Sequence, residues 1–298
     1  MRKHKESFSS RLLDVFINLS MFLIMIIMVY PFLNVIAMSL SSNDNLMLGN
    51  VSFFPRGINF NAYSLVLKDN LVWSAYKNTV LYAAGSVITM LSCTALLAYP
   101  LSIAEFKAKK LITVYLTITM FFSGGLIPTY LWIRQLGLIG TYWVMILPGC
   151  VSAYNVFVFR TFFQGLSKEL RESAYIDGAN DVVLLVRIVL PLSKALFATF
   201  TLFSIVGTWN SWFNALIYLK DERSYPLQLI LRRYLFNPLE GIDGTVPQEM
   251  QMMLQSLKIN PKSVRMAVVV VAMLPITFLY PFLQKYFVTG VTLGSIKG

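Results

Sequence analysis

The stretch Glu172-Ser-Ala-Tyr-Ile-Asp-Gly-Ala-Asn180, which runs on to Ile188-Val-Leu-Pro191, is polar and lies between two long apolar segments. Ser167 precedes it and is a candidate N-cap, because its hydroxyl can accept a hydrogen bond from a backbone N–H of the first helical turn. Gly178 is expected to end the resulting helix, since glycine readily adopts the left-handed conformation found at many helix C-termini.

A second short helix is expected directly after this glycine. Asn180 or Asp181 is placed to cap it, and it should run through Ile188 and end at Pro191, which cannot continue a helix. The stretch therefore predicts two short helices joined at a glycine. They are expected to lie on the water side of a membrane and to dock on another protein.

The composition around this stretch is that of a membrane protein. Of the 298 residues, 56% are hydrophobic and only 13% are charged, far below the charged share of about a quarter in soluble domains. Six apolar runs reach the roughly 20 residues that span the hydrocarbon of a bilayer. These runs are 16–40, 80–103, 111–133, 142–163, 195–219 and 264–286. The sequence predicts an all-α polytopic membrane protein with a single six-helix domain over 1–298.

The polar stretch resembles the EAA coupling loop of ABC-importer permeases, in which Ser173 stands at the first alanine position and Ala174 at the second. The resemblance implies that 166–191, between the fourth and fifth helices, is a cytoplasmic coupling loop that docks in a groove of a separate ATPase subunit. The implied ATPase-coupling residues are Glu172, Ser173, Ala174, Asp177, Gly178, Ala179, Ile188, Leu190 and Pro191.

Basic residues in short loops predict the orientation. Arg2, Lys3, Lys5 and Arg11 precede the first run, and the loop after the second run carries Lys107, Lys109 and Lys110, whereas the loop after the third carries only Arg134. Because lysine and arginine accumulate on the cytoplasmic side, both termini and the coupling loop are expected in the cytoplasm of a multi-pass protein of the cell membrane.

Two runs contain groups that suit a solute pathway. The third holds Ser123-Gly-Gly-Leu-Ile-Pro-Thr-Tyr130, where the glycines and the proline predict either close helix packing or a break that lines the pathway. The fifth holds Gly207-Thr-Trp-Asn-Ser-Trp-Phe-Asn214, in which residues four apart are expected on one helix face. Stacked aromatic rings and amides suit sugars, and the alternative is an interfacial aromatic belt. The candidate pathway residues are Tyr130, Trp209, Asn210, Phe213 and Asn214.

The tail 287–298 is rich in glycine and resembles the end of carbohydrate-type permeases, such as the second membrane subunit of the maltose system. In that family the tail enters the interface between two ATPase subunits. The resemblance implies this position for Gly290, Thr292, Gly294 and Lys297.

These features predict a non-catalytic permease subunit of an ATP-driven, binding-protein-dependent importer of sugars, in particular oligosaccharides. No Gly-x-x-x-x-Gly-Lys-Ser/Thr motif is present, so ATP and Mg²⁺ are expected on a partner. The expected partners are two ATP-binding subunits, a second and distinct permease chain, and an extracellular solute-binding protein. A permease for another solute is an alternative. An ion-coupled transporter is disfavoured, because the central portions of the runs lack Asp, Glu and His.

The remaining composition excludes other classes of function. The net charge of +11 is spread over loop ends on both sides of the bilayer, so no nucleic-acid partner is expected. With His4 as its one histidine, and Cys93 and Cys150 inside apolar runs, the chain offers no histidine metal site and no disulfide framework. No motif of an intramembrane enzyme is present.

Overall fold

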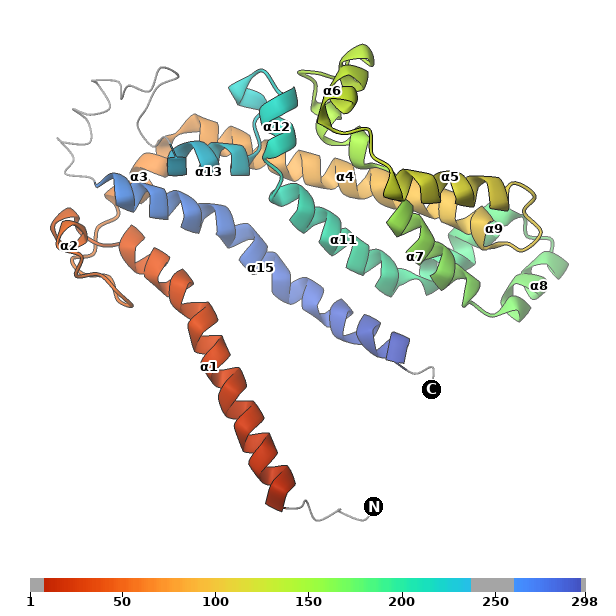
Figure 1. Cartoon of the computed structure of the whole chain (residues 1–298), viewed down its shortest axis with the longest axis horizontal. Coiled ribbons are helices and arrows are strands. Elements are labelled where there is room, and N and C mark those ends of the chain that lie inside the picture. Colours follow the sequence, from red (N-terminus) through yellow and green to blue (C-terminus); the bar gives the residue numbers. More distant parts are fainter. Residues whose placement is uncertain (1–7, 237–259, 296–298) are drawn as a thin grey trace. The chain divides into compact units, whose positions relative to one another are not determined.

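The computed structural model describes residues 8–236 and 260–295, which are helices and short connections without a strand in those ranges (Figure 1). The first part of the chain forms α1 (Phe8–Ser39), α2 (Asn43–Met47), α3 (Asn61–Lys68) and α4 (Asn70–Ser102). Then follow α5 (Lys109–Phe121), α6 (Leu126–Gln135), the 3₁₀ turns η1 (Tyr142–Met145) and η2 (Leu147–Gly149), and α7 (Ala153–Gln164).

The coupling stretch and the remaining chain are helical as well. They form α8 (Lys168–Ile176), α9 (Asp181–Leu184), the π-helical turn η3 (Leu185–Val189), α10 (Leu190–Leu192) and α11 (Lys194–Trp209). The last elements are α12 (Phe213–Tyr218), η4 (Glu222–Ser224), α13 (Leu227–Phe236) and α15 (Pro261–Ser295).

The chain divides into two compact units. The first combines Met1–Asp69 with Leu231–Met273, and the second combines Asn70–Ile230 with Leu274–Gly298. In the first unit, side chains hold the connections between helices. The Tyr234 hydroxyl donates to Asp69 Oδ2 at 2.5 Å, and the Ser39 and Tyr63 hydroxyls lie 2.7 Å apart. Burial and the Asp69 carboxylate raise the pKa of Tyr234, so its hydroxyl stays a hydrogen-bond donor.

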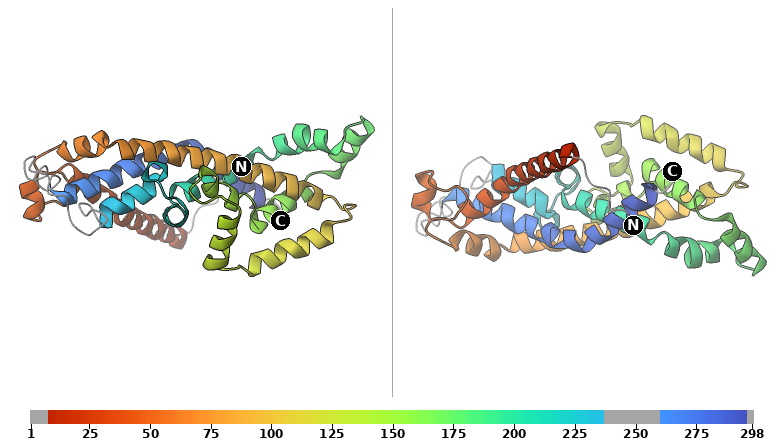
Figure 2. Two further views of the ribbon diagram at one scale, coloured as in Figure 1. Left: turned by 90° about the horizontal axis from the view of Figure 1, so that it is seen from above. Right: turned by 90° about the horizontal axis from the view of Figure 1, so that it is seen from below.

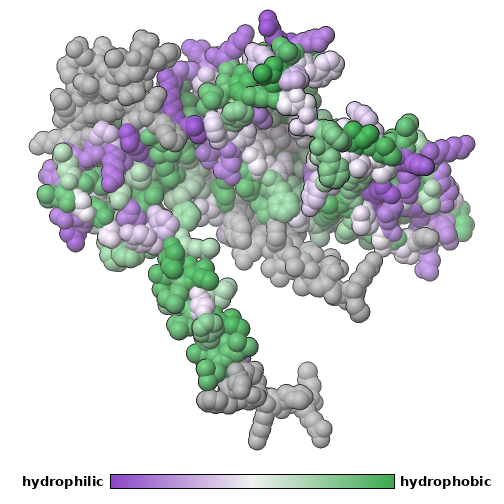
Figure 3. All heavy atoms as spheres, in the orientation of Figure 1, coloured by the Kyte–Doolittle hydropathy of each residue, from purple (hydrophilic) through white to green (hydrophobic). Residues whose placement is uncertain are grey.

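α1 is the most apolar helix, and before Asn34 it has few contacts with other described residues, whereas Ala37 and Ser39 near its end are buried. Its side chains from Leu12 to Leu33 are nearly all exposed, and Figure 3 shows them as a green hydrophobic column. Exposed apolar surface of this extent is unfavourable in water. Such a helix therefore requires hydrocarbon or another chain as its surroundings.

In the second unit α4 is the central helix. It packs against α7 and α11, and α7 packs against α5. One apolar core lies near the end of α4, where Ala98 and Leu101 are fully buried beside Val156 and Phe159 of α7. Both views of Figure 2 place α8 and α9, in green, beyond this end of the unit. A second core, around Tyr82, lies closer to the start of α4.

Three of the six expected spans are interrupted. The third breaks at Phe122–Gly125, where Gly125 has a φ of +80° and opens α6. The fourth consists of η1, η2 and α7 with a 50° bend. The fifth breaks after Trp209, because Asn210 is the C-cap of α11 and α12 begins only at Phe213. Asn210 and Asn214 therefore do not share a face of one helix, and neither do Trp209 and Phe213.

The other expected boundaries also shift. α4 begins at Asn70, ten residues before the expected start at 80, and α1 begins at Phe8. α15 continues beyond 286 to Ser295, so 287–295 extend this helix and do not form a separate tail. Lys297 and the basic residues Arg2, Lys3 and Lys5 lie outside the described residues.

By length and composition, three helices among the described residues are long and apolar enough to cross a bilayer, and five if each bent pair counts as one span. The three single helices are Leu12–Ser39, Asn70–Ser102 and Pro261–Phe278. The bent pairs are Tyr142–Gly149 with Ala153–Gln164, and Asp181–Leu192 with Lys194–Trp209, which meet at 78°. The count of six spans stays a prediction.

The close packing of α4 against Ile146, which lies between η1 and η2, makes a testable prediction. A Cβ at Gly85 would lie 2.6 Å from Ile146 Cδ1, so Gly85→Val should destabilise the purified chain by about 1–3 kcal/mol through overpacking. Gly207→Ala is the matched control, since its Cβ would meet nothing within 4 Å and alanine favours a helix. Thermal unfolding in detergent measures both, and a Gly85→Val variant as stable as the wild type would contradict the packing.

Candidate functional site

The first half of the coupling stretch is the helix α8, and local hydrogen bonds define both of its ends. The Ser167 hydroxyl accepts from the Glu169 N–H at 3.2 Å, as the sequence predicted. At the other end Gly178 has a φ of +79°, its N–H donates to Tyr175 O at 3.0 Å, and the Ala179 N–H donates to Ala174 O at 2.9 Å. This pair of bonds is a Schellman motif, and it confirms that the helix closes at the glycine.

The second half begins at Asn180, whose Oδ1 accepts from the Val183 N–H at 2.9 Å. The helical run then continues to Leu192, one residue past the end predicted at Pro191. A π-helical turn over Leu185–Val189 precedes the proline. Such turns shift the hydrogen-bond register of a helix, which helps to accommodate the N–H that proline lacks.

The coupling stretch is attached to the core on one face. Ala174, Leu184, Leu185 and Val189 are buried in the same core as Tyr99 and Phe159. Of the predicted coupling residues, Ala179, Ile188 and Leu190 pack against this core. Ala174 is only 7% exposed, so a larger side chain in its place would push α8 away from the bundle.

The opposite face of the coupling stretch is exposed. Glu172, Ser173, Asp177, Gly178 and Pro191 are exposed there. They are accompanied by large apolar side chains, among them Ile176, which is 86% exposed, and Val182, which is 69% exposed. Figure 3 shows hydrophilic side chains, in purple, gathered with some apolar ones over this end of the unit. A mixed face of carboxylates and apolar side chains suits contact with a protein.

Asp181 holds the two halves of the stretch together, which the sequence did not reveal. Its Oδ1 accepts a hydrogen bond from the Tyr175 hydroxyl at 2.6 Å and from the Tyr99 hydroxyl at 3.2 Å. The bond to Asp181 raises the pKa of Tyr175, which keeps this hydroxyl protonated as a donor at neutral pH. Asp181 therefore links α8, α9 and α4.

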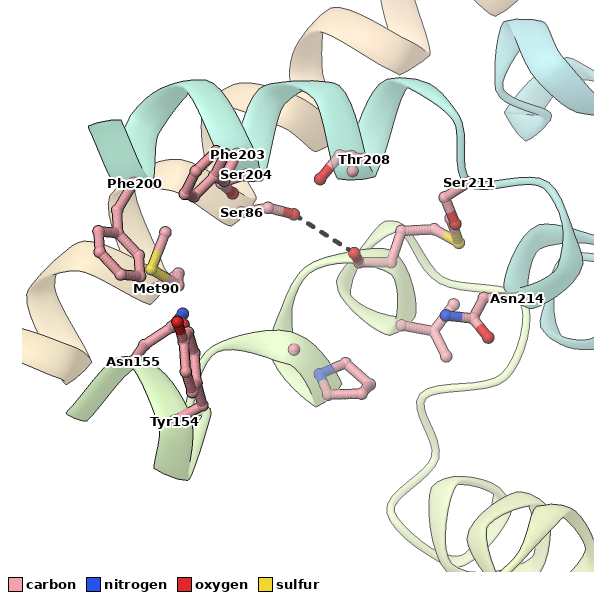
Figure 4. A pocket seen from close by; sticks show the side chains of 15 residues that line it. Ser86, Met90, Tyr154, Asn155, Phe200, Phe203, Ser204, Thr208, Ser211 and Asn214 are labelled. Carbon is pink, nitrogen blue, oxygen red and sulfur yellow. Dashed lines mark hydrogen bonds between the residues drawn. The ribbon is translucent and has the colours of Figure 1, made fainter. Parts of the chain in front are cut away.

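The second candidate site is a pocket of about 360 Å³ between α4, α7, α11 and the broken segments beside them. This volume lies within the range of small-ligand sites, about 300–1,000 Å³. Figure 4 shows Phe200 of α11 opposite Asn155 and Tyr154 of α7, with Phe203, Ser204 and Thr208 farther along α11. None of the described residues that line the pocket is charged.

Hydroxyls and amides supply the polar groups of this pocket. The Ser86 hydroxyl donates to Met145 O at 3.5 Å. The side chains of Asn155, Ser204 and Asn214 make no hydrogen bond to another described residue, so their donors and acceptors are free for a solute. Aromatic rings beside amides and hydroxyls suit a sugar, which presents C–H faces and hydroxyl edges.

The predicted pathway residues lie in different places. Asn214 lines the pocket. Trp209 is 5% exposed and packs edge-on against Tyr76, with ring centroids 6.2 Å apart. Asn210 lies outside the pocket lining, where its Oδ1 accepts from Gln228 Nε2 at 3.2 Å.

The two aromatic residues of the prediction are also apart from the pocket lining. Phe213 is 47% exposed and lies edge-on to Trp212. Tyr130 stacks on Tyr218, with centroids 6.0 Å apart. The sequence analysis missed Ser86, Asn155, Ser204 and Thr208, although polar residues within apolar runs were the available signal.

The predicted tail residues Gly290, Thr292 and Gly294 belong to the last turns of α15. Lys297 lies outside the described residues. Among the described residues, no group of three or more His, Cys, Asp or Glu could hold a metal ion.

Comparison with known proteins assigns the chain to a family. Residues 2–293 match the family described as binding-protein-dependent transport system inner membrane component. The chain belongs to this family of permeases.

Relatives of the permease span nearly its whole length. Protein LplC of Bacillus subtilis is 37% identical over 273 residues, which cover 91% of the permease and 90% of the relative. The polygalacturonan/rhamnogalacturonan transport system permease protein YtcP of Bacillus subtilis is 34% identical over 289 residues, covering 97% and 99%.

A solved structure supports the fold. It is a bacterial ABC transporter involved in the import of the acidic polysaccharide alginate, one chain of which is 30% identical with a TM-score of 0.89. The match covers 96% of the permease and 100% of that chain. The helical architecture is therefore that of an ABC-importer permease.

The pocket makes a prediction about two asparagines of the broken fifth span. Asn214→Leu should lower solute uptake per assembled complex about five- to tenfold, because a hydrogen bond contributes about 1–1.5 kcal/mol. Asn210→Leu is the matched comparison and should change uptake less than about twofold. Uptake into proteoliposomes, normalised to complex content, measures both. A larger loss in Asn210→Leu than in Asn214→Leu would assign the pathway to Asn210 instead.

Proposed function

We propose that this permease is one of two membrane chains of an ATP-driven importer of oligosaccharides, and that the segment 166–191 couples it to a separate ATPase. ATP and Mg²⁺ would be bound by the ATPase subunits, and this chain would contribute half of the pathway without catalysing a reaction. Transport would follow from ATP favouring one arrangement of the two permease halves over the other.

The observation that carries the proposal is the construction of the coupling stretch. One face of α8 and α9 is buried in the bundle core through Ala174 and Leu184, whereas Glu172 and Ile176 on the other face are exposed. The Schellman motif at Gly178 and the Asp181 bonds fix the shape of the segment. A rigid segment that is anchored in the core can transmit a displacement by a neighbouring protein to the helices of the bundle.

Two findings support an oligosaccharide as the solute. YtcP bears the name of a polygalacturonan and rhamnogalacturonan permease, and the matching solved structure is of an alginate importer. The pocket is lined by hydroxyls, amides and aromatic rings without a charged side chain among its described residues. This lining suits sugar hydroxyls, and any recognition of sugar carboxylates would fall to residues outside it.

The assembly would follow from the family. The name of the family implies a solute-binding protein, which would deliver the sugar from outside the cell. We propose six spans with both termini and the coupling segment in the cytoplasm, a distinct permease chain as the second half, and two ATP-binding subunits. The last turns of α15, with Gly290, Thr292 and Gly294, would lie near the ATPase interface.

Charge reversal on the coupling helix tests the proposal. Glu172→Lys should lower ATP-driven uptake at least tenfold, because it reverses the charge of an exposed carboxylate on the proposed docking face and so disturbs the charge complementarity of that contact. Glu105→Lys is the matched control, since Glu105 is exposed in the loop before α5 and lies outside the coupling segment. Sugar uptake into membrane vesicles and co-purification of the ATPase are the measurements. Wild-type uptake in Glu172→Lys would refute the docking role.

A further inference from the structure

The two cysteines of the chain, Cys93 of α4 and Cys150 after η2, lie beside each other although they belong to different spans. Their thiols are within hydrogen-bonding reach of one another. Both thiols are free and both residues are half-buried, so neither is sealed inside the core. Because the chain has no other cysteine, each can form an intrachain disulfide only with the other. We call Cys93 and Cys150 the thiol pair.

The packing of α4 against the start of the fourth span explains why the two cysteines meet. The Ser86 hydroxyl of α4 donates to Met145 O at 3.5 Å, and the residue before Ser86 packs on the Ile146 side chain. η2 then packs against the same helix. Cys93 lies about two helical turns beyond Ser86, and Cys150 directly follows η2. The thiol pair therefore continues one line of contacts between α4 and the fourth span.

The thiol pair borders the pocket from two sides. Met90, three residues before Cys93, lines the pocket from α4, and Gly149, directly before Cys150, lines it from η2. Residues three apart are neighbours on one face of a helix. A bond between the two sulfur atoms would therefore join the wall of the pocket on α4 to the wall on the fourth span.

The backbone at Cys150 has the freedom that closure of the pair requires. Cys93 lies inside the 33-residue helix α4, whereas Cys150 lies in the break between η2 and α7, where the span bends by 50°. Disulfide formation demands a specific approach of the two side chains. The break can supply this adjustment, because Cys150–Ser152 belong to no helix.

We propose that the thiol pair is an oxidation site, which a two-electron thiol oxidant such as a diazene closes to a disulfide, and that the closed site arrests transport. One thiol adds to the N=N bond, and its proton passes to the second nitrogen. The other sulfur then attacks the first, so that the S–S bond forms, the S–N bond breaks and the departing nitrogen takes the second proton. The two cysteines lose two electrons, and the diazene leaves as a hydrazine.

The arrest of transport rests on the proposed function, because it requires the walls of the pocket to move relative to each other as the pathway opens and closes. A disulfide between α4 and the break of the fourth span would hold two of these walls together. A dithiol reductant should release them, because thiol–disulfide exchange returns both thiols.

Treatment of the assembled transporter with diamide, a membrane-permeant diazene, tests the site itself. After denaturation, this chain should show no thiol that a maleimide can alkylate, against two before oxidation, and its intact mass should fall by two hydrogens. Cys93→Ser and Cys150→Ser are the matched controls, because each retains one thiol and cannot form the intrachain bond. The measurement is made both in membranes and in detergent, so that access of the reagent does not limit it.

Sugar uptake into proteoliposomes tests the arrest. Uptake should fall in proportion to the oxidised fraction, about tenfold when about nine chains in ten are closed, and dithiothreitol should restore it. Diamide should change the uptake of either serine variant less than about twofold. These variants are assembled with the same partner chains, so they also show whether oxidation of a partner causes the loss.

The outcomes separate this inference from the proposed function. Two alkylated thiols after oxidation, in membranes and in detergent, would refute the oxidation site. A disulfide that forms without loss of uptake would refute the arrest and leave the proposed function standing. An equal loss of uptake in the serine variants would also refute the arrest. If the complex shows no sugar uptake before oxidation, the proposed function fails, and the arrest fails with it.

Discussion

The packing of α4 against α7 and α11 is the interaction on which the rest of the second unit depends. Its apolar contacts form the core around Ala98, Leu101 and Phe159, in which the coupling segment is also anchored. Burial of this apolar surface holds the spans together. The hydrogen bonds that α4 makes to Asp181 and to the turn at Arg223 lie toward its two ends. The pocket and the exposed coupling segment are thus arranged around one central helix.

The interruptions of the neighbouring spans have a physical consequence. Backbone groups released by a helix break within a membrane need partners, which a polar cavity or adjoining protein can supply. Gly149 at the end of η2, Ser211 in the break after α11 and Asn214 of α12 all line the pocket. The breaks of the fourth and fifth spans therefore contribute to the lining of the pocket, whereas the break of the third span does not.

Much of the coupling segment could be predicted from local sequence. The Ser167 cap, the stop at Gly178 and the Asn180 cap depend on residues within a few positions of one another, so their hydrogen bonds follow from spacing alone. The apolar runs likewise predicted a helical membrane protein, because hydrophobic length is a property of the chain itself. The helix was predicted to end at Pro191, and it ends one residue later, because α10 includes the proline and reaches Leu192.

The sequence by itself determined the helical class, the membrane setting and the design of the coupling segment, because these depend on composition and on neighbours in the chain. Only the tertiary structure decided which polar residues meet. Tyr99 and Asp181 are 82 positions apart and Asn78 and Arg223 are 145 apart, and no local pattern links them. The structure also separated Asn210 from Asn214, since a helix break depends on packing around it, which helical periodicity does not include.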